Sequence, residues 1–143
     1  MEHPMKKTWI VVADEAIARL LEVDDRILKP VEELTDPDAH AKAAEMRHDA
    51  HGRRGNSITA SAGEAELHQE GQRFAKQVAQ RLAQFHQEGR FSSLKVVAAP
   101  RFLGYLRQAW SPQVAGIIAD ELDKDLVKAS FDELEKRLLP AHA

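Results

Sequence analysis

Residues 47–57, RHDAHGRRGNS, contain the side chains best suited to hold a charged ligand. Arg47, Arg53 and Arg54 outnumber a single aspartate here, so the segment carries a charge of +2 before any histidine protonates. An arginine presents its N–H groups as a planar fork that matches two oxygens of a phosphate. The segment therefore favours an RNA backbone or a phosphate-rich crevice as its partner, although a solvated surface loop has the same composition.

Four further residues of this segment complete the candidate site: His51, Gly52, Gly55 and Asn56. The two glycines permit positive backbone φ angles and let a partner approach the backbone closely. A basic segment that contains glycines suits a partner whose charge is spread along a backbone.

The sequence predicts no metal site, no cofactor site and no catalytic residue. Three histidines lie near one another in the chain, at His40, His48 and His51, but none forms the i, i+4 pair of a zinc-binding helix. Four aspartates could supply carboxylates for metal-assisted hydrolysis, but no spacing places any two of them together: Asp14, Asp36, Asp38 and Asp49. A glycine-rich phosphate loop, a dinucleotide fingerprint and a GxSxG elbow are absent. We therefore expect a protein that is not an enzyme, and we keep a hydrolase as an alternative.

Arg101 is a second candidate for phosphate binding. It follows an apolar strand predicted at 94–99, and Pro100 between them suits the first turn of a helix. A helix that begins at the carboxyl end of a parallel strand often binds anions. The alternative is that Pro100 only starts the helix and Arg101 lies in solvent.

The composition predicts one globular domain over residues 1–143. The chain is 43% hydrophobic and 30% charged, with a formal charge of −3, which excludes a wholly basic nucleic-acid binder. It has no cysteine, which excludes disulfides and thiol chemistry. The first apolar run, residues 9–13, is too short for a signal peptide, and no run could span a membrane. We expect a soluble cytoplasmic protein that does not bind membranes, of unknown oligomeric state.

Apolar, β-branched runs predict three consecutive strands in the first quarter of the chain, at 8–13, 18–23 and 30–35. A hairpin turn is expected at 14–17, and a series of neighbouring strands implies an antiparallel meander. The polar stretch at about 36–63 shows no sustained period, so we expect a long flexible loop, with a short helix at 39–46.

The second half of the chain alternates helices with strands. An amphipathic helix is predicted at 64–88, where five apolar residues recur at helical spacing: Leu67, Phe74, Val78, Leu82 and Phe85. A strand at 94–99 and a helix at 101–110 follow, and 117–122 fits either type. Ser130 and Glu133 form a capping-box pattern that opens a last helix, to about 139. Alternation implies parallel strands, so the fold class is α/β, a mixed sheet with helices on both faces.

Three stretches make the chain similar to a known bacterial family, the host attachment proteins, or proteins required for attachment to host cells. These stretches are Trp9–Asp14 with Ala18–Leu20, the run AAPRFLGYLR at 98–107, and Asp123–Leu126. The resemblance extends from about Thr8 to Leu138, and the Pro-Arg-Phe-Leu-Gly run is its most specific part. The family title describes no mechanism.

That family in turn resembles the middle domain of the archaeal and eukaryotic class-1 translation release factor. The resemblance implies a mixed α/β fold with a functional loop before a long helix, where the release factor carries His-Gly-Arg-Gly-Gly-Gln-Ser. Residues 51–57 match five of those seven positions, with Arg54 in place of the first glycine of the tripeptide and Asn56 in place of the glutamine. Arg54 obstructs the close approach that peptidyl-ester hydrolysis needs, and Asn56 is one methylene shorter. Binding to RNA survives these changes better than hydrolysis does.

The leading hypothesis is a non-enzymatic binding module whose partner is structured RNA or the ribosome. The second hypothesis takes the family title literally and makes the protein a support for attachment to host cells or surfaces. The third is a hydrolase with a degenerate release-factor-like loop.

Overall fold

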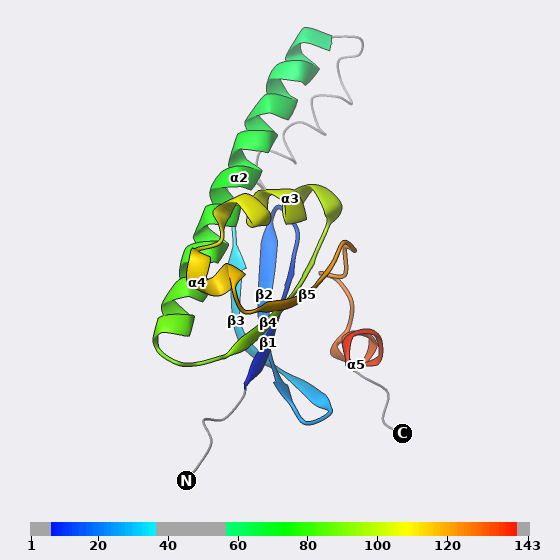
Figure 1. Ribbon diagram of the computed structural model, residues 1–143. Coiled ribbons are helices and arrows are strands. Elements are labelled where there is room, and N and C mark those ends of the chain that lie inside the picture. The colour runs from blue at the N-terminus through cyan, green and yellow to red at the C-terminus, as the bar shows by residue number, and fades with distance from the viewer. Residues whose placement is uncertain (1–6, 37–56, 140–143) are drawn as a thin grey trace.

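The computed structural model describes the backbone of residues 7–36 and 57–139, and the side chains of 7–36 and 68–139. Figure 1 shows a twisted sheet with a long helix lying across one face and a short helix on the other. The predicted helix at 39–46 and most of the predicted loop lie outside the described residues. The flexibility of that loop stays a prediction.

Five strands form one sheet in the order β3-β2-β1-β4-β5. The elements in chain order are β1 (Thr8–Ala13), β2 (Ile17–Asp24), β3 (Ile27–Thr35), α2 (Ser57–Gln87), β4 (Ser93–Ala98), α3 (Pro100–Ala109), α4 (Pro112–Ala115), β5 (Ile118–Leu122) and α5 (Phe131–Leu138). The first three strands pair antiparallel, whereas β1 with β4 and β4 with β5 pair parallel. The predicted α/β class, meander and parallel half are therefore confirmed.

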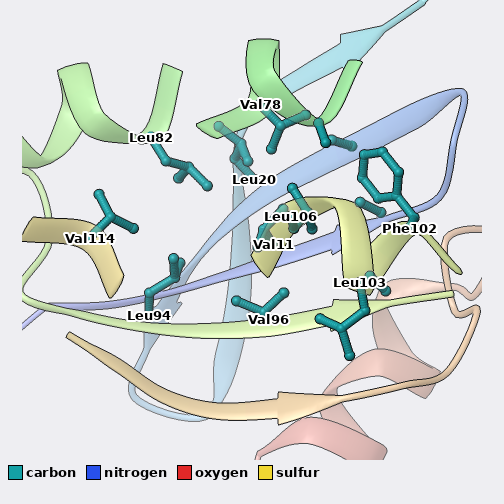
Figure 2. Close-up of a cluster of buried hydrophobic side chains, with 14 of the residues drawn as sticks. Val11, Leu20, Val78, Leu82, Leu94, Val96, Phe102, Leu103, Leu106 and Val114 are labelled. Atoms are coloured by element: carbon teal, nitrogen blue, oxygen red, sulfur yellow. The ribbon is translucent and has the colours of Figure 1, made fainter. Parts of the chain in front are cut away.

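The central strand β1 is buried on both faces, as its continuous apolar run predicts. Trp9, Val11 and Ala13 lie in a large core under the long helix, whereas Ile10 and Val12 lie in a smaller core on the opposite face. Figure 2 shows the large core, where α2, α3 and α4 cover the sheet. Helices therefore cover both faces, because α5 packs Leu134 and Leu138 into the smaller core.

Helix α2 buries four residues of the predicted stripe, since Phe74, Val78, Leu82 and Phe85 are each at most 5% exposed. The fifth, Leu67, lies outside the residues whose side chains are described. It begins at Ser57 rather than at Glu64, so residues 57–63 are helical and not part of a loop. The apolar pattern reveals only the part of a helix that packs on a core. Extending an existing helix costs far less than starting one, so a polar turn can precede the stripe.

Two of the remaining helices, α4 and α5, begin at a serine whose side chain caps them. Val114 donates its backbone N–H to Ser111 Oγ at 3.2 Å, and Pro112 takes the first helical position of α4, an element that the apolar pattern did not predict. The ambiguous segment after it is a strand, β5. In the last helix the N–H of Glu133 donates to Ser130 Oγ at 3.1 Å, which confirms the predicted cap. No helix in the described part of the chain is long and apolar enough to cross a membrane.

Candidate binding site

The chain changes direction at the carboxyl ends of β1 and β4, which lie side by side in the middle of the sheet. After β1 the chain turns to β2 on one side, and after β4 it passes through α3 and α4 to β5 on the other. Ligands of open α/β sheets bind in the crevice outside such a divergence. The end of the sheet at which β1 and β4 finish is therefore the first place to look for a functional site. We call it the carboxyl-terminal edge, or simply the edge, and distinguish it from the outer strands β3 and β5.

The strand register brings the turn after β1 against the start of α3. Ala13 pairs with Ala98, and the N–H of Ala99 donates to the Ala13 carbonyl at 3.3 Å. Because both strands run in the same direction, Glu15 and Arg101 leave the sheet side by side.

Asp14 shapes the turn that presents Glu15. Its Oδ1 accepts the backbone N–H groups of Ala16 and Ile17 at 2.8 and 2.9 Å. Its own N–H donates to the Ile17 carbonyl at 2.9 Å, which closes the hairpin predicted at 14–17. The Asp14 carboxylate is thus committed to the turn, whereas Glu15 at the tip is directed to the sheet edge.

Arg101 and Tyr105 lie one turn apart on α3 and so on the same helix face. Arg101 is exposed, and Tyr105 is buried. The residue before the helix is Ala99, so no side chain caps the first N–H groups of α3. The edge therefore presents a guanidinium on a rigid helix beside donors that receive no side-chain cap.

Gly71 lets α2 pack closely against this edge. A Cβ at position 71 would lie 2.7 Å from Tyr105 Cε2 and 3.5 Å from Glu15 Cγ, so only glycine fits without a shift. One turn earlier, His68 meets the Tyr105 ring edge-on, with centroids 4.9 Å apart. The Tyr105 hydroxyl forms a hydrogen bond with His68 Nδ1. We call Glu15, His68, Arg101 and Tyr105 the edge cluster.

The electrostatics of the edge cluster follow from partial burial beside a cation. Burial raises the pKa of Glu15, Asp14 adds to this effect, and the charges of Arg101 and His68 oppose it. Burial, and next the charge of Glu15, raise the pKa of Tyr105, whereas the charge of Arg101 and its hydrogen bond to the phenol act in the opposite direction. The Tyr105 hydroxyl and His68 Nδ1 share a hydrogen bond whose direction depends on the imidazole tautomer. In the tautomer in which Nδ1 accepts from the phenol, the imidazole N–H is at Nε2, where it can be donated to a ligand.

Of the residues predicted to bind phosphate, Arg101 is the one that the structure describes. The others lie outside the described residues: Arg47, His51, Gly52, Arg53, Arg54, Gly55 and Asn56. Glu15, His68 and Tyr105 were not predicted, because they come from three distant segments. One sequence feature could have pointed to this place: Gly71, a residue that is unfavourable inside an otherwise regular helix. Within the described residues, no three metal-binding side chains converge.

Arg101 also differs from most other arginines in its pairing. Five arginines in the described part each form an ion pair with a glutamate: Arg73, Arg81, Arg90, Arg107 and Arg137. Arg101 forms no ion pair with any described residue, although the Glu15 charge acts on it from the same edge. Its guanidinium hydrogen-bonds to the Tyr105 side chain and is paired with no carboxylate of the described part.

Two solved structures resemble parts of this fold. The crystal structure of the archaeal translation termination factor aRF1 has 10% sequence identity and a TM-score of 0.48, over 80% of this chain and 29% of that chain. The Ppx/GppA phosphatase of Aquifex aeolicus, type II variant, has 13% identity and a TM-score of 0.39, over 82% and 36%. A release factor is thus among the similar structures, as expected. The chain spans well under half of either structure, and at these TM-scores neither likeness carries an argument about function.

No curated protein matches the chain. A family model does match it, over residues 9–138, with the description "Protein required for attachment to host cells". The match includes the turn after β1, the part of α2 that bears His68 and Gly71, and the start of α3. Because this range covers most of the chain, the protein belongs to the family of proteins required for attachment to host cells.

Proposed function

We propose that this domain is a non-enzymatic, cytoplasmic binding module that engages structured RNA or the ribosome through phosphate contacts. The observation that carries the proposal is Arg101, an exposed guanidinium at the start of α3 that forms no ion pair with a described residue. A guanidinium in this situation is suited to bidentate phosphate binding.

The proposal extends to the basic segment between β3 and α2. The N–H of Asp36, at the end of β3, donates to the carbonyl of Ala16 at 2.9 Å, beside the Glu15 turn. Arg47, Arg53 and Arg54 follow in the sequence before α2 begins at Ser57, and in the proposal they add phosphate contacts to that of Arg101.

The remaining residues of the segment have supporting roles in the proposal. Gly52 and Gly55 allow a sugar-phosphate backbone to come close to the protein backbone. His51 and Asn56 offer polar side chains beside the arginines. Because phosphate contacts carry no base information, we expect recognition of RNA shape and charge more than of sequence.

Cosedimentation with ribosomes at two salt concentrations tests the proposal. Joint replacement of Arg47, Arg53 and Arg54 by alanine should lower the slope of log K against log salt by about 3, roughly 1 per phosphate contact. Arg101→Ala should lower it by a further 1 or so. The matched control removes three exposed cations around the β2–β3 turn and α5, which are Arg26, Lys29 and Lys136.

The control has the same net charge as the triple variant and should bind ribosomes nearly as well as the parent. Lys29 and Lys136 form only exposed ion pairs, whose loss costs little stability. Equal binding by the parent and the triple arginine variant at both salt concentrations would contradict RNA binding. An esterase activity that needs Asn56 would favour the hydrolase, and recovery at the outer cell surface would favour a direct role in attachment.

A further inference from the structure

The edge cluster contains an acid where a pure anion site would have none. Glu15 lies against Gly71 and on the same edge as Arg101, and the β1–β4 register holds both in place. An ionised carboxylate at this point competes with an anionic ligand for the guanidinium. A protonated carboxyl group does not compete, and it can donate a hydrogen bond to a phosphate oxygen.

We propose that Glu15, His68, Arg101 and Tyr105 form one phosphodiester-binding subsite, which takes up a proton at Glu15 when the phosphodiester binds. The choice of ligand rests on the proposed function. Arg101 supplies the fork, and His68 supplies its Nε2–H. Tyr105 orients His68 by donating to Nδ1 and is a positioning residue.

The geometry specifies how each group reaches the subsite. Arg101 and Tyr105 share one face of α3, and His68 is held against Tyr105 by the ring contact and the hydrogen bond. The absent side chain at Gly71 sets the distance between α2 and both Glu15 and Tyr105. Three segments that are far apart in the sequence thus bring Glu15, His68 and Arg101 close enough for the charges of His68 and Arg101 to act on Glu15.

The sign of the proton linkage follows from charge. Bound phosphodiester repels the ionised Glu15 carboxylate, so binding raises the pKa of Glu15 and takes up a proton. By linkage, affinity rises as the pH falls through the pKa of Glu15, which burial already raises above the ordinary value of 4.5. The groups that face Glu15 are Asp14 from its own turn, Arg101 and Tyr105 from α3, and His68 from α2.

The probe is dimethyl phosphate, because its single charge does not change over the pH range used. Backbone amide NMR of the full chain reports binding at the start of α3, at pH 5 and pH 8. Four variants are compared with the parent: Glu15→Gln, His68→Gln, Arg101→Ala and the control Asp25→Asn. Asp25 lies in the turn between β2 and β3, at the other end of the strands from the edge cluster. Its φ is 61°, which asparagine tolerates.

The parent should bind dimethyl phosphate more tightly at pH 5 than at pH 8, by up to about tenfold, as expected when one like charge is removed from a half-buried site. Glu15→Gln should bind more tightly than the parent at pH 8, with most of the pH dependence gone. Arg101→Ala should lose binding at both pH values. The control should behave like the parent.

His68→Gln tests which of two groups, Glu15 or His68, takes up the proton. It should weaken binding and still retain most of the pH dependence. If the pH dependence survives in Glu15→Gln and disappears in His68→Gln, the proton goes to the imidazole and the proposal is wrong. It is also wrong if dimethyl phosphate shifts no amide near Arg101 at either pH.

The proposed function and this subsite can fail separately. Ribosome binding that is sensitive to the arginines of 47–54 but not to Glu15 or Arg101 would support the function and overturn the subsite. Proton-linked binding of dimethyl phosphate without ribosome binding would support the subsite and contradict the function.

Discussion

Gly71 shows how one missing methyl group can organise a site. In helix propensity a glycine here costs about 1 kcal/mol relative to alanine. The close packing of α2 on Tyr105 offsets this cost, since a Cβ at position 71 would lie 2.7 Å from the Tyr105 ring. Tyr105 is buried and bonded to His68, so the ring cannot move aside freely.

We therefore predict that Gly71→Ala destabilises the protein by about 1–3 kcal/mol, the usual cost of overpacking, despite the better helix propensity. Gly104→Ala is the matched control, because Gly104 lies within α3 and a Cβ there meets nothing within 4 Å. It should stabilise the protein by up to about 1 kcal/mol. Urea denaturation of both variants measures the difference. Equal effects of the two substitutions would contradict the close packing at Gly71.

Glu15 gives a prediction about pH. Its pKa in the folded state is raised by burial, so the folded state binds this proton more tightly than the unfolded state does. The associated stability is present below the ordinary value of 4.5 and is lost as the pH rises through the raised pKa.

The unfolding free energy of the parent minus that of Glu15→Gln should therefore be largest near pH 4 and smaller near pH 8. Chemical denaturation of both proteins at several pH values measures this difference. A difference that increases with pH would mean that Arg101 outweighs burial at this carboxyl. It would also weaken the case for proton uptake on ligand binding.

At the scale of elements, α2 has two different roles along its length. From Phe74 to Phe85 it seals the larger core, whereas at His68 and Gly71 it lies over the edge cluster. The helix axis is common to both parts, so the packing of the first part fixes the position of the second. Stability and site geometry are thereby coupled through one element.

Val78→Asp should accordingly abolish or strongly weaken folding, because it places a charge at a site with 0% exposure, at a cost of several kcal/mol. Gln80→Asp adds the same charge on the exposed face of α2 and should change stability by less than about 0.5 kcal/mol. Thermal unfolding followed by circular dichroism compares the two. A cooperative transition of Val78→Asp near the temperature of the parent would show that α2 does not seal the core as described.

At the scale of the whole molecule, the sheet separates two cores of different size. The larger lies under α2, α3 and α4, and the smaller is covered by α5 (Figure 1). The central strands β1 and β4 each have a hydrogen-bonded neighbour on both sides, whereas β3 and β5 are the edges of the sheet. Local opening is easiest where fewest contacts must break.

Native-state hydrogen exchange should therefore show the slowest amides in β1 and β4 and faster exchange in β5 and α5. The amides of α5 should exchange through partial opening. The reason is that α5 is eight residues long and buries Leu134 and Leu138 against the smaller core. Equal protection of β1 and α5 would indicate instead that the two cores open only together.

Local patterns allowed much of this architecture to be predicted. The apolar run of β1, the helical stripe of α2 and the Ser130 cap each depend on residues close in sequence, and the structure confirms them. The start of α2 and the short helix α4 were missed, because their polar residues give no periodic signal. Family membership also followed from the sequence, through short contiguous runs such as Pro100–Gly104.

The sequence alone thus determined the class of fold, its strand directions and Arg101 as a candidate ligand-binding residue. Only the tertiary structure brought Glu15, His68 and Tyr105 to that arginine, from a turn and two helices. The physical reason is that strand register and helix packing act between residues distant in the chain. Periodicity and capping act within a few residues, so they position each element but cannot show which side chains from different elements meet.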